Sequence, residues 1–225
     1  GDYLKEVGQA LANRDGSQWL MLEEKEWLEP FREFAVNAMM VQIRKDLALM
    51  GIHHEVFTSE TELHCTGAID SAIDFLRERG LVYEGTLAPP KGKVLEDWEP
   101  RLQLLFRSTD FGDDMDRALQ KSDGTWTYFA GDIAYHYDKF RRGYTRMINV
   151  WGADHVGTTK RVISAVKAIT EEKGNLDIIL CQIVNFTEGG QPIKMSKRAG
   201  TFIEVRDVIE KVGKDAFRFM MVTRK

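Results

Sequence analysis

The strongest constraint on the fold is an alternation of apolar and amphipathic segments in the second half of the chain. Residues 147–151 predict a buried strand, residues 155–170 predict a helix, and residues 178–184 predict a second apolar strand. A strand, a helix and a strand in this order are typical of a crossover between parallel strands. The pattern predicts an α/β fold in which ligands bind beyond the carboxyl ends of the strands.

The segment Gly152-Ala153-Asp154-His155 follows the first predicted strand and is the first candidate ligand site. Gly152 and Ala153 are small enough for a flat ligand to approach the backbone. Asp154 can accept hydrogen bonds from ribose hydroxyls, and His155 falls in the first turn of the next helix. An equally simple interpretation makes Asp154 the N-cap of that helix.

A second candidate site is the loop of residues 192–201, whose centre reads Lys194-Met195-Ser196-Lys197 and which follows a Gly189-Gly190 hairpin turn. Two mobile ammonium groups three residues apart can offset the charge that develops on a departing pyrophosphate. Flexible lysines suit this task better than rigid arginine forks. The simpler alternative for a Lys-x-x-Lys pattern is a solvated basic turn.

The part of the chain before residue 128 is predicted to contain helices, an exposed connection and short strands. These are an amphipathic helix over 24–50, a helix over 65–80 ended by Gly80, a connection over 85–100, and strands over 102–128 with turns at Gly112 and Gly124. The apolar stripe of the first helix is expected to be buried. Its members are Trp27, Phe31, Phe34, Ala35, Ala38, Met39, Val41, Ile43 and Leu47.

Composition excludes several classes of protein. No run approaches the roughly 18 apolar residues of a membrane helix, and the first residues do not form a signal peptide. Cys65 and Cys181 are too few for a disulfide framework, so both are expected to be free thiols in a reducing, cytoplasmic setting. The net charge of -4 argues against nonspecific coating of nucleic acid.

The sequence predicts no metal site. No Cys-x-x-Cys or His-x-x-x-His spacing occurs, and the five histidines are scattered. The acidic run of Asp113, Asp114 and Asp116 could hold a cation, but a charged hairpin turn is the favoured interpretation.

Together these motifs resemble a known enzyme family. The lysine loop resembles the KMSKS signature of class I aminoacyl-tRNA synthetases, and the Gly-Ala-Asp-His segment, the hairpin and this loop occur in the same order. Residues 105–114, 128–136 and 213–221 resemble bacterial arginyl-tRNA synthetases more narrowly. The resemblance spans nearly the whole chain.

The resemblance implies a Rossmann-like, doubly wound parallel sheet, the C-terminal half of the class I catalytic fold, with an inserted α+β connective segment. It implies a division of the chain into four segments. These are a helical part of the catalytic domain over 1–64, the inserted segment over 65–127, the second half of the catalytic domain over 128–212, and the start of a link to an anticodon-binding helical domain over 213–225.

The resemblance also implies roles for single residues. Tyr128, Asp132 and His155 would bind arginine, because a carboxylate can read a planar guanidinium through paired charge-assisted hydrogen bonds. ATP would be bound by Gly152, Asp154, His155, Lys194, Met195, Ser196 and Lys197, and Lys194 and Lys197 would be the catalytic residues. Without the other motifs, Asp132 would be interpreted as a helix cap and Tyr128 as a core residue.

The implied function is arginine–tRNA ligase activity, with ATP and Mg²⁺ as substrate and no permanently bound cofactor. The expected partners are arginine, ATP and tRNA(Arg), without a membrane, in a monomeric parent enzyme. The His-x-Gly-His signature of the first half of the class I fold does not occur here, so a partial catalytic domain is predicted and the isolated chain is expected to be inactive. A non-catalytic nucleotide- or tRNA-binding module and another class I aminoacyl-tRNA ligase are the alternatives.

Overall fold

The chain forms two compact units. The computed structural model describes residues 3–87, 101–182, 184, 187–188, 190–192 and 203–223. One unit, here named the sheet unit, comprises residues 58–183, and the other, the helical unit, comprises residues 1–57 and 184–225. The four segments expected from the sequence (1–64, 65–127, 128–212 and 213–225) have other boundaries than these two units. Their functional division stays a prediction.

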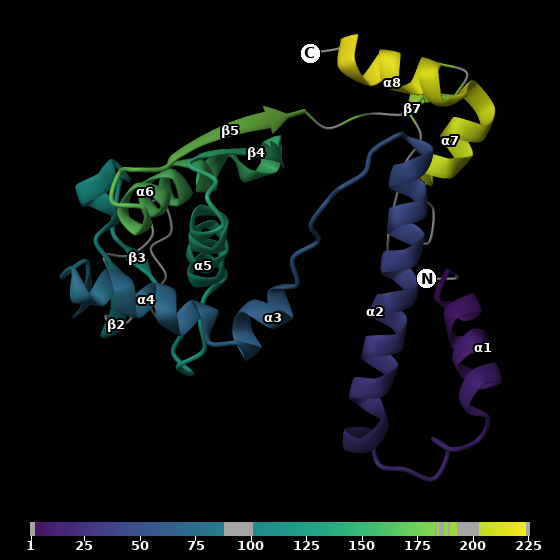
Figure 1. Cartoon of the computed structure of the whole chain (residues 1–225), viewed down its shortest axis with the longest axis horizontal. Coiled ribbons are helices and arrows are strands. Elements are labelled where there is room, and N and C mark those ends of the chain that lie inside the picture. Colours follow the sequence, from purple (N-terminus) through teal and green to yellow (C-terminus); the bar gives the residue numbers. More distant parts are fainter. Residues whose placement is uncertain are drawn as a thin grey trace. The chain divides into compact units, whose positions relative to one another are not determined.

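The sheet unit contains most of the α/β pattern expected from the sequence (Figure 1). Its helices are α3 Glu60–Cys65, α4 Ala68–Glu78, α5 Tyr128–Arg141 and α6 Thr159–Ile169, with the short 3₁₀ helices η1 Ser108–Phe111 and η2 Ala153–Thr158. Its strands are β1 Val82–Gly85, β2 Gln103–Phe106, β3 Arg117–Ala118, β4 Arg146–Gly152 and β5 Asn175–Cys181.

Strands β4 and β5 form a parallel pair, and helix α6 connects them. Their register runs from Arg146 opposite Asn175 to Gly152 opposite Cys181. The predicted strand–helix–strand crossover is therefore confirmed. Strands β1, β2 and β3 form a separate antiparallel sheet in the order β1-β2-β3. Among the described residues, the fold is α/β with small sheets.

Three predicted boundaries are wrong. The helix expected over 65–80 is α4, which begins only at Ala68, after Gly67 with a φ angle of 70°. The helix expected over 155–170 is divided into η2 and α6. Hydroxyls of Thr158 and Thr159 donate to the carbonyls of His155 and Val156, and such local bonds compete with regular helix formation. The strand expected over 178–184 begins three residues earlier, and it ends at Cys181.

The turns expected at three glycines are confirmed. Gly80, Gly112 and Gly124 have φ angles of 69°, 95° and 80°, in the left-handed region that glycine enters without steric cost. Leu81 N donates to Leu76 O at 3.1 Å, so the chain after Gly80 closes the end of α4 as a helix C-terminus commonly does.

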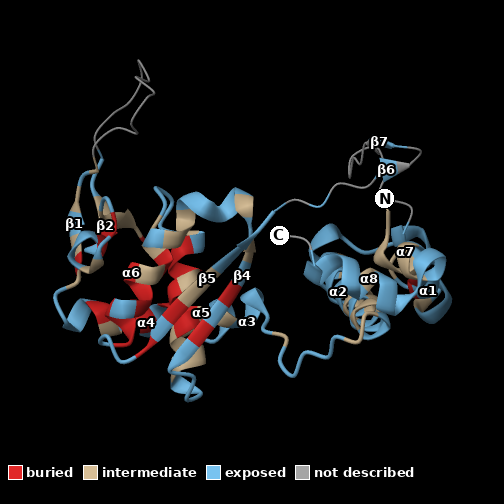
Figure 2. Cartoon of the chain, turned by 90° about the horizontal axis from the view of Figure 1, so that it is seen from above, coloured by how far each residue is buried: buried red, intermediate tan, exposed pale blue. Residues whose placement is uncertain are grey.

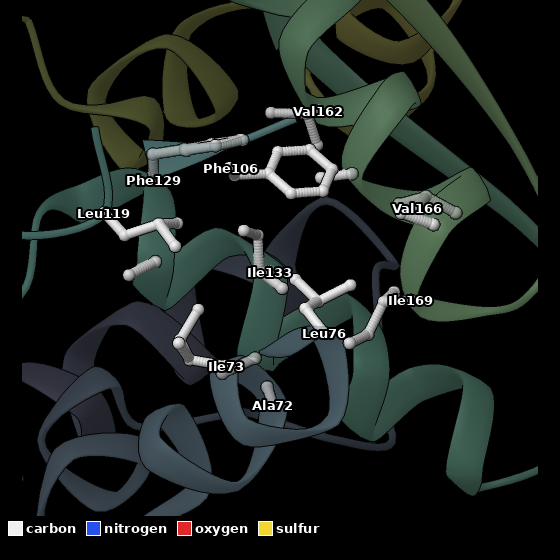
Figure 3. Packing of buried hydrophobic residues seen from close by; sticks show 14 of the residues in the cluster. Ala72, Ile73, Leu76, Phe106, Leu119, Phe129, Ile133, Val162, Val166 and Ile169 are labelled. Carbon is white, nitrogen blue, oxygen red and sulfur yellow. The ribbon is translucent and has the colours of Figure 1, made fainter. Parts of the chain in front are cut away.

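An apolar core fixes the position of α5 within the sheet unit. Figure 2 shows the buried residues gathered in α4, α5, α6 and β4, and Figure 3 shows their side chains packed together. The fully buried members include Ile73 and Leu76 from α4, Phe106 from β2, Ile133 from α5, and Val162, Val166 and Ile169 from α6. Because burial of one such side chain contributes about 1.5–3 kcal/mol, this cluster holds the helix that carries Tyr128 and Asp132.

The acidic run after η1 is accounted for by protein partners. Asp113 accepts two hydrogen bonds of 2.7 Å from Arg117 and another from Ser108, which also contacts Ser164 of α6 at 2.7 Å. Burial alone would raise the pKa of Asp113, but the bonds from Arg117 and Ser108 outweigh it and the pKa is lowered. This network ties η1 to α6.

The other two aspartates of the run are also paired. Asp114 forms an ion pair with Lys160, and Asp116 accepts hydrogen bonds from Tyr83 and Thr109. No cluster of His, Cys, Asp and Glu side chains in the described part of the chain could hold a metal ion. The structure supports the charged-turn interpretation.

The helical unit consists of α1 Tyr3–Asp15, α2 Glu24–Leu49, α7 Val205–Val212 and α8 Lys214–Thr223, with the antiparallel pair β6 Thr187–Glu188 and β7 Gln191–Pro192. The predicted helix over 24–50 and the hairpin before the lysine loop are therefore confirmed. None of the described helices is both long enough and apolar enough to cross a membrane.

The expected burial of the α2 stripe is wrong in degree. No residue of α2 is fully buried, and Val41 and Ile43 are 54% and 42% exposed. Of the described elements in this unit, α1 and α7 are the two that pack closely on α2. Helix periodicity marks a face that can be covered, but neighbouring elements decide how much of it is covered.

The turn between α6 and β5 is strained. Glu171 and Glu172 have φ angles of 51° and 60°, which cost a residue with a side chain about 1–2 kcal/mol. Glu171 compensates through contacts of 3.4 Å with Arg79 and 3.3 Å with Lys173. The exposed Glu172 has only a backbone hydrogen bond, from its N–H to Lys167 O at 2.8 Å.

We expect Glu172→Gly to raise the free energy of unfolding by about 0.5–1 kcal/mol, because relief of the left-handed strain exceeds the entropic cost of glycine. Urea unfolding followed by circular dichroism measures this change. The matched control is Glu172→Ala, which removes the same charge but keeps a Cβ, and it should leave the midpoint unchanged. Equal shifts in the two variants would contradict the strain argument.

Candidate functional site

Helix α5 presents the first two predicted ligand-binding residues. Its N-cap is Thr127, whose hydroxyl accepts from Ala130 N at 3.4 Å, and Asp132 lies one turn further along the helix. The alternative that Asp132 caps the helix is therefore wrong. Tyr128 and Asp132 are four residues apart, so they lie on the same face of the helix.

A pocket of about 330 Å³ opens on this face of α5. It is lined by Thr58, Glu60, Leu63, Tyr128, Gly131, Asp132 and Tyr135. The lining combines two carboxylates with two phenol rings, and all of it belongs to the sheet unit. The structure thus brings Tyr128 and Asp132 together.

The carboxylate of Asp132 lacks a close cationic partner. Burial is the largest influence on its pKa and raises it, while Arg161 opposes the rise, Glu60 adds to it, and His155 opposes it more weakly. None of the ion pairs among the described residues includes Asp132. A half-buried carboxylate with a second carboxylate nearby would be stabilised by a cationic ligand.

Tyr128 is available to a ligand. It is 79% exposed, so the alternative that it packs in the core is wrong. Lys121 Nζ lies 5.9 Å from the centre of its ring. A phenol at the edge of the pocket can donate one hydrogen bond and offer its ring face to a planar cation.

The segment after β4 presents Asp154 and His155 at the surface. Asp154 Oδ2 lies 3.7 Å from His155 Nε2, and both side chains are more than half exposed. The N-cap of α6 is Thr158, so the alternative that Asp154 caps this helix is wrong. A Cβ at Gly152 would lie 2.6 Å from Asp154 Oδ1, so a larger residue there would displace that carboxylate.

His155 does not line the pocket, although it is close enough to influence the pKa of Asp132. Its ring packs against Trp151, with 6.1 Å between the ring centres. The loop residues Lys194, Met195, Ser196 and Lys197 lie outside the described residues. The roles assigned to these residues stay predictions.

Sequence reasoning missed two charged or aromatic residues of the pocket. Tyr135 falls three residues after Asp132, and this helical spacing could have identified it. Glu60 comes from α3, about 70 residues earlier in the chain, and no local pattern connects it with α5. Only packing of α3 against α5 brings it to the pocket.

We expect Asp132→Asn to stabilise the ligand-free protein at neutral pH. A carboxyl group with a raised pKa in the folded state loses stability as the pH rises from its unfolded pKa through its folded pKa, so removal of the charge is favourable above that window. Urea unfolding at pH 7.5 and near pH 4 would measure the difference, which should shrink at the lower pH. Asp138→Asn, which breaks the Asp138–Arg142 ion pair on the same helix, is the control and should not stabilise. A destabilised Asp132→Asn variant would contradict the argument.

Known proteins match this chain over its whole length. No protein-family model matches it. Over 225 residues it is 56% identical to the arginine–tRNA ligases of Ruegeria pomeroyi and of Paracoccus denitrificans, and over 228 residues it is 57% identical to that of Beijerinckia indica. In each case all of this chain is matched, and it spans 39% of the length of the relative.

The fold agrees with this likeness. A crystal structure from Campylobacter jejuni that is assigned to the arginyl-tRNA synthetases matches all of this chain with a TM-score of 0.80 and 30% identity, and the chain covers 45% of that structure. Sequence and fold therefore agree over the full length of the chain. The chain belongs to the arginyl-tRNA synthetase family, of whose full-length members it represents about two fifths.

Proposed function

We propose that this chain is part of an enzyme that activates arginine with ATP and transfers it to tRNA(Arg). The observation that carries the proposal is the pocket on α5, where the half-buried Asp132 lacks an ion-pair partner and Glu60 adds a second carboxylate. Such a pocket favours a cation. Its place in a chain that is 54–57% identical to arginine–tRNA ligases selects arginine as that cation.

Recognition of the side chain would rest on Asp132 and Tyr128. The carboxylate of Asp132 accepts a pair of hydrogen bonds from the guanidinium, and Tyr128 contacts the same group from the edge of the pocket. A lysine ammonium cannot make the paired contact, because it is a point charge rather than a planar fork. His155 would contribute from the end of β4.

Activation then requires only positioning and charge stabilisation. The carboxylate of arginine attacks the α-phosphate of ATP, the bond to the β-phosphate breaks, and pyrophosphate leaves. The terminal ribose hydroxyl of the tRNA next attacks the arginyl carbonyl and releases AMP. ATP enters with Mg²⁺ as substrate, bound by Gly152, Asp154, His155 and residues 194–197, with Lys194 and Lys197 offsetting charge on the departing phosphates.

The finer fold proposed for the parent enzyme is a doubly wound, Rossmann-like parallel sheet. Support comes from the β4–β5 pair, since parallel strands are normally covered on both faces. Met147 and Asn149 are buried on one face of β4, whereas Ile148 and Val150 on the other face are 52% and 64% exposed. Ile179 of β5, 51% exposed, lies opposite Val150 and extends the open face. Further strands and a covering layer would fit this surface.

The parent enzyme is proposed to be monomeric and cytoplasmic. Its partners would be arginine, ATP and tRNA(Arg). ATP–pyrophosphate exchange that depends on arginine, followed by charging of tRNA(Arg), tests the activity directly in the full-length enzyme. Exchange that depends on another amino acid, or none at all, would refute the proposal.

In the full-length enzyme, Asp132→Asn should raise the Michaelis constant for arginine by at least about a hundredfold, while the constant for ATP changes little. The substitution keeps the shape but removes the ion pair, and the loss of one partner of a buried pair typically costs about 3–5 kcal/mol. Steady-state pyrophosphate exchange measures both constants. Asp138→Asn on the same helix is the control and should resemble the wild type. An unchanged constant for arginine in Asp132→Asn would disprove the assignment.

A separate prediction concerns the lysine loop. Lys197→Ala should lower the rate of adenylate formation about a hundredfold or more, the scale of losing one preorganised charge-stabilising donor, with arginine affinity nearly unchanged. Lys194→Ala should have a similar or milder effect. Single-turnover kinetics in the full-length enzyme reports this step. The control is Lys167→Ala, which changes an exposed lysine of α6 outside both candidate sites. A Lys197→Ala rate within about threefold of wild type would identify the loop as a solvated turn.

A further inference from the structure

A hydrogen-bonded chain of polar side chains connects helix α5 with strand β4. His136 of α5 is 2% exposed and Asn149 of β4 is 7% exposed. Asn149 Nδ2 lies 2.9 Å from His136 Nε2, His136 Nδ1 lies 2.7 Å from the carbonyl oxygen of Asp132, and Lys139 Nζ donates to Asn149 Oδ1 at 3.2 Å. Sequence reasoning did not identify any of these three side chains.

The contacts allow one assignment of the protons. The carbonyl of Asp132 only accepts, so His136 Nδ1 carries a hydrogen, and Lys139 fixes the amide of Asn149 with its oxygen toward the ammonium. The amide nitrogen of Asn149 then donates to His136 Nε2. Burial lowers the pKa of His136 to about 4 against the opposing effect of the bond to the Asp132 carbonyl, and repulsion from Lys139 adds to the lowering. The imidazole is therefore neutral, as this arrangement requires.

This hydrogen-bonded series of side chains contacts the pocket walls at two points. One is the backbone of Asp132, whose carbonyl holds His136. The other is the ring of Tyr135, which lines the pocket and has Lys139 Nζ 4.1 Å from its centre. On the other side, Asn149 lies three residues before Gly152, where the candidate nucleotide-binding segment begins. The side chains therefore connect the walls of one candidate site with the strand that leads into the other.

We propose that the Lys139–Asn149–His136 chain is a positioning device that holds the arginine pocket of α5 in register with the nucleotide-binding end of β4. This proposal rests on the function proposed above. Apolar residues of the same volume would fill the space between α5 and β4, but they would allow the helix to slide or rotate on the strand. Directional hydrogen bonds permit one alignment, and a misplacement of about 1 Å between reacting groups can cost a hundredfold in rate.

The test uses Asn149→Leu in the full-length enzyme, because leucine keeps the number and branching of the side-chain heavy atoms and removes both hydrogen bonds. We expect the single-turnover rate of arginyl-adenylate formation, per active site, to fall at least about tenfold, while the separately measured dissociation constants for arginine and ATP each change less than about threefold. Loss of stability alone would lower the number of active sites but would leave the rate of each one unchanged.

A second variant keeps the test decisive if Asn149→Leu folds poorly. Asn149→Asp still accepts from Lys139, but it offers His136 Nε2 a carboxylate oxygen, so His136 should take up a proton. Nitrogen chemical shifts of ¹⁵N-labelled histidine should show a neutral Nδ1–H tautomer in the wild type down to about pH 5 and a protonated ring near neutral pH in Asn149→Asp. The adenylation rate of this variant should then vary with pH between 6 and 8 more steeply than that of the wild type.

Ser164→Ala is the matched control, since it disrupts the buried contact with Ser108 in the same core, and the described hydrogen bonds of Ser164 do not reach α5 or β4. It should lower stability and leave the adenylation rate per active site unchanged. An active wild type with an Asn149→Leu rate within about threefold of it, or an Nε2–H tautomer in the wild type, would overturn the proposal. A wild type that forms no arginyl-adenylate would instead overturn the proposed function itself.

Discussion

The arrangement of the sheet unit depends on how helix α5 is held. Its inner face buries Ile133 in the apolar cluster formed with α4, α6 and β2, and this burial stabilises the position of the helix. Apolar contact is not directional, however, so it leaves the rotation and height of the helix incompletely defined. The buried hydrogen bond between His136 and Asn149 is directional, and it ties the orientation of the helix to strand β4. The outer face is then free to present Asp132 in a fixed place.

The charges of the pocket show why such fixation is needed. Asp132 is half-buried, its pKa is raised by that burial, and Glu60 adds a second negative charge without a compensating ion pair. A pocket of this kind is unfavourable for the empty protein and favourable for a cationic ligand. The apolar core on the opposite face of α5 offsets this cost, as is common where a functional group is held in an environment that suits its ligand better than the free protein.

The sequence predicted the features that depend on local pattern. Apolar runs and helical spacing identified β4, α6 and β5, and the four-residue spacing of Tyr128 and Asp132 placed both on one face of α5. What it could not predict depends on packing between distant segments. Glu60 reaches the pocket because α3 packs on α5, and the partial cover of α2 reflects how few elements contact it. The roles of residues 194–197 rest on resemblance and stay predictions.

The two candidate sites also show why a parallel pair of strands would suit the proposed chemistry. Strand β4 delivers Gly152 at its carboxyl end, where ligands of α/β folds bind, while α5 precedes β4 in the chain and is joined to it by the His136–Asn149 hydrogen bond. One short strand therefore carries both the partner of His136, at Asn149, and the start of the candidate nucleotide-binding segment. A shift of α5 along β4 would change the separation of the two proposed substrate sites. Because the proposed reaction needs no protein nucleophile, its rate would depend most directly on that separation.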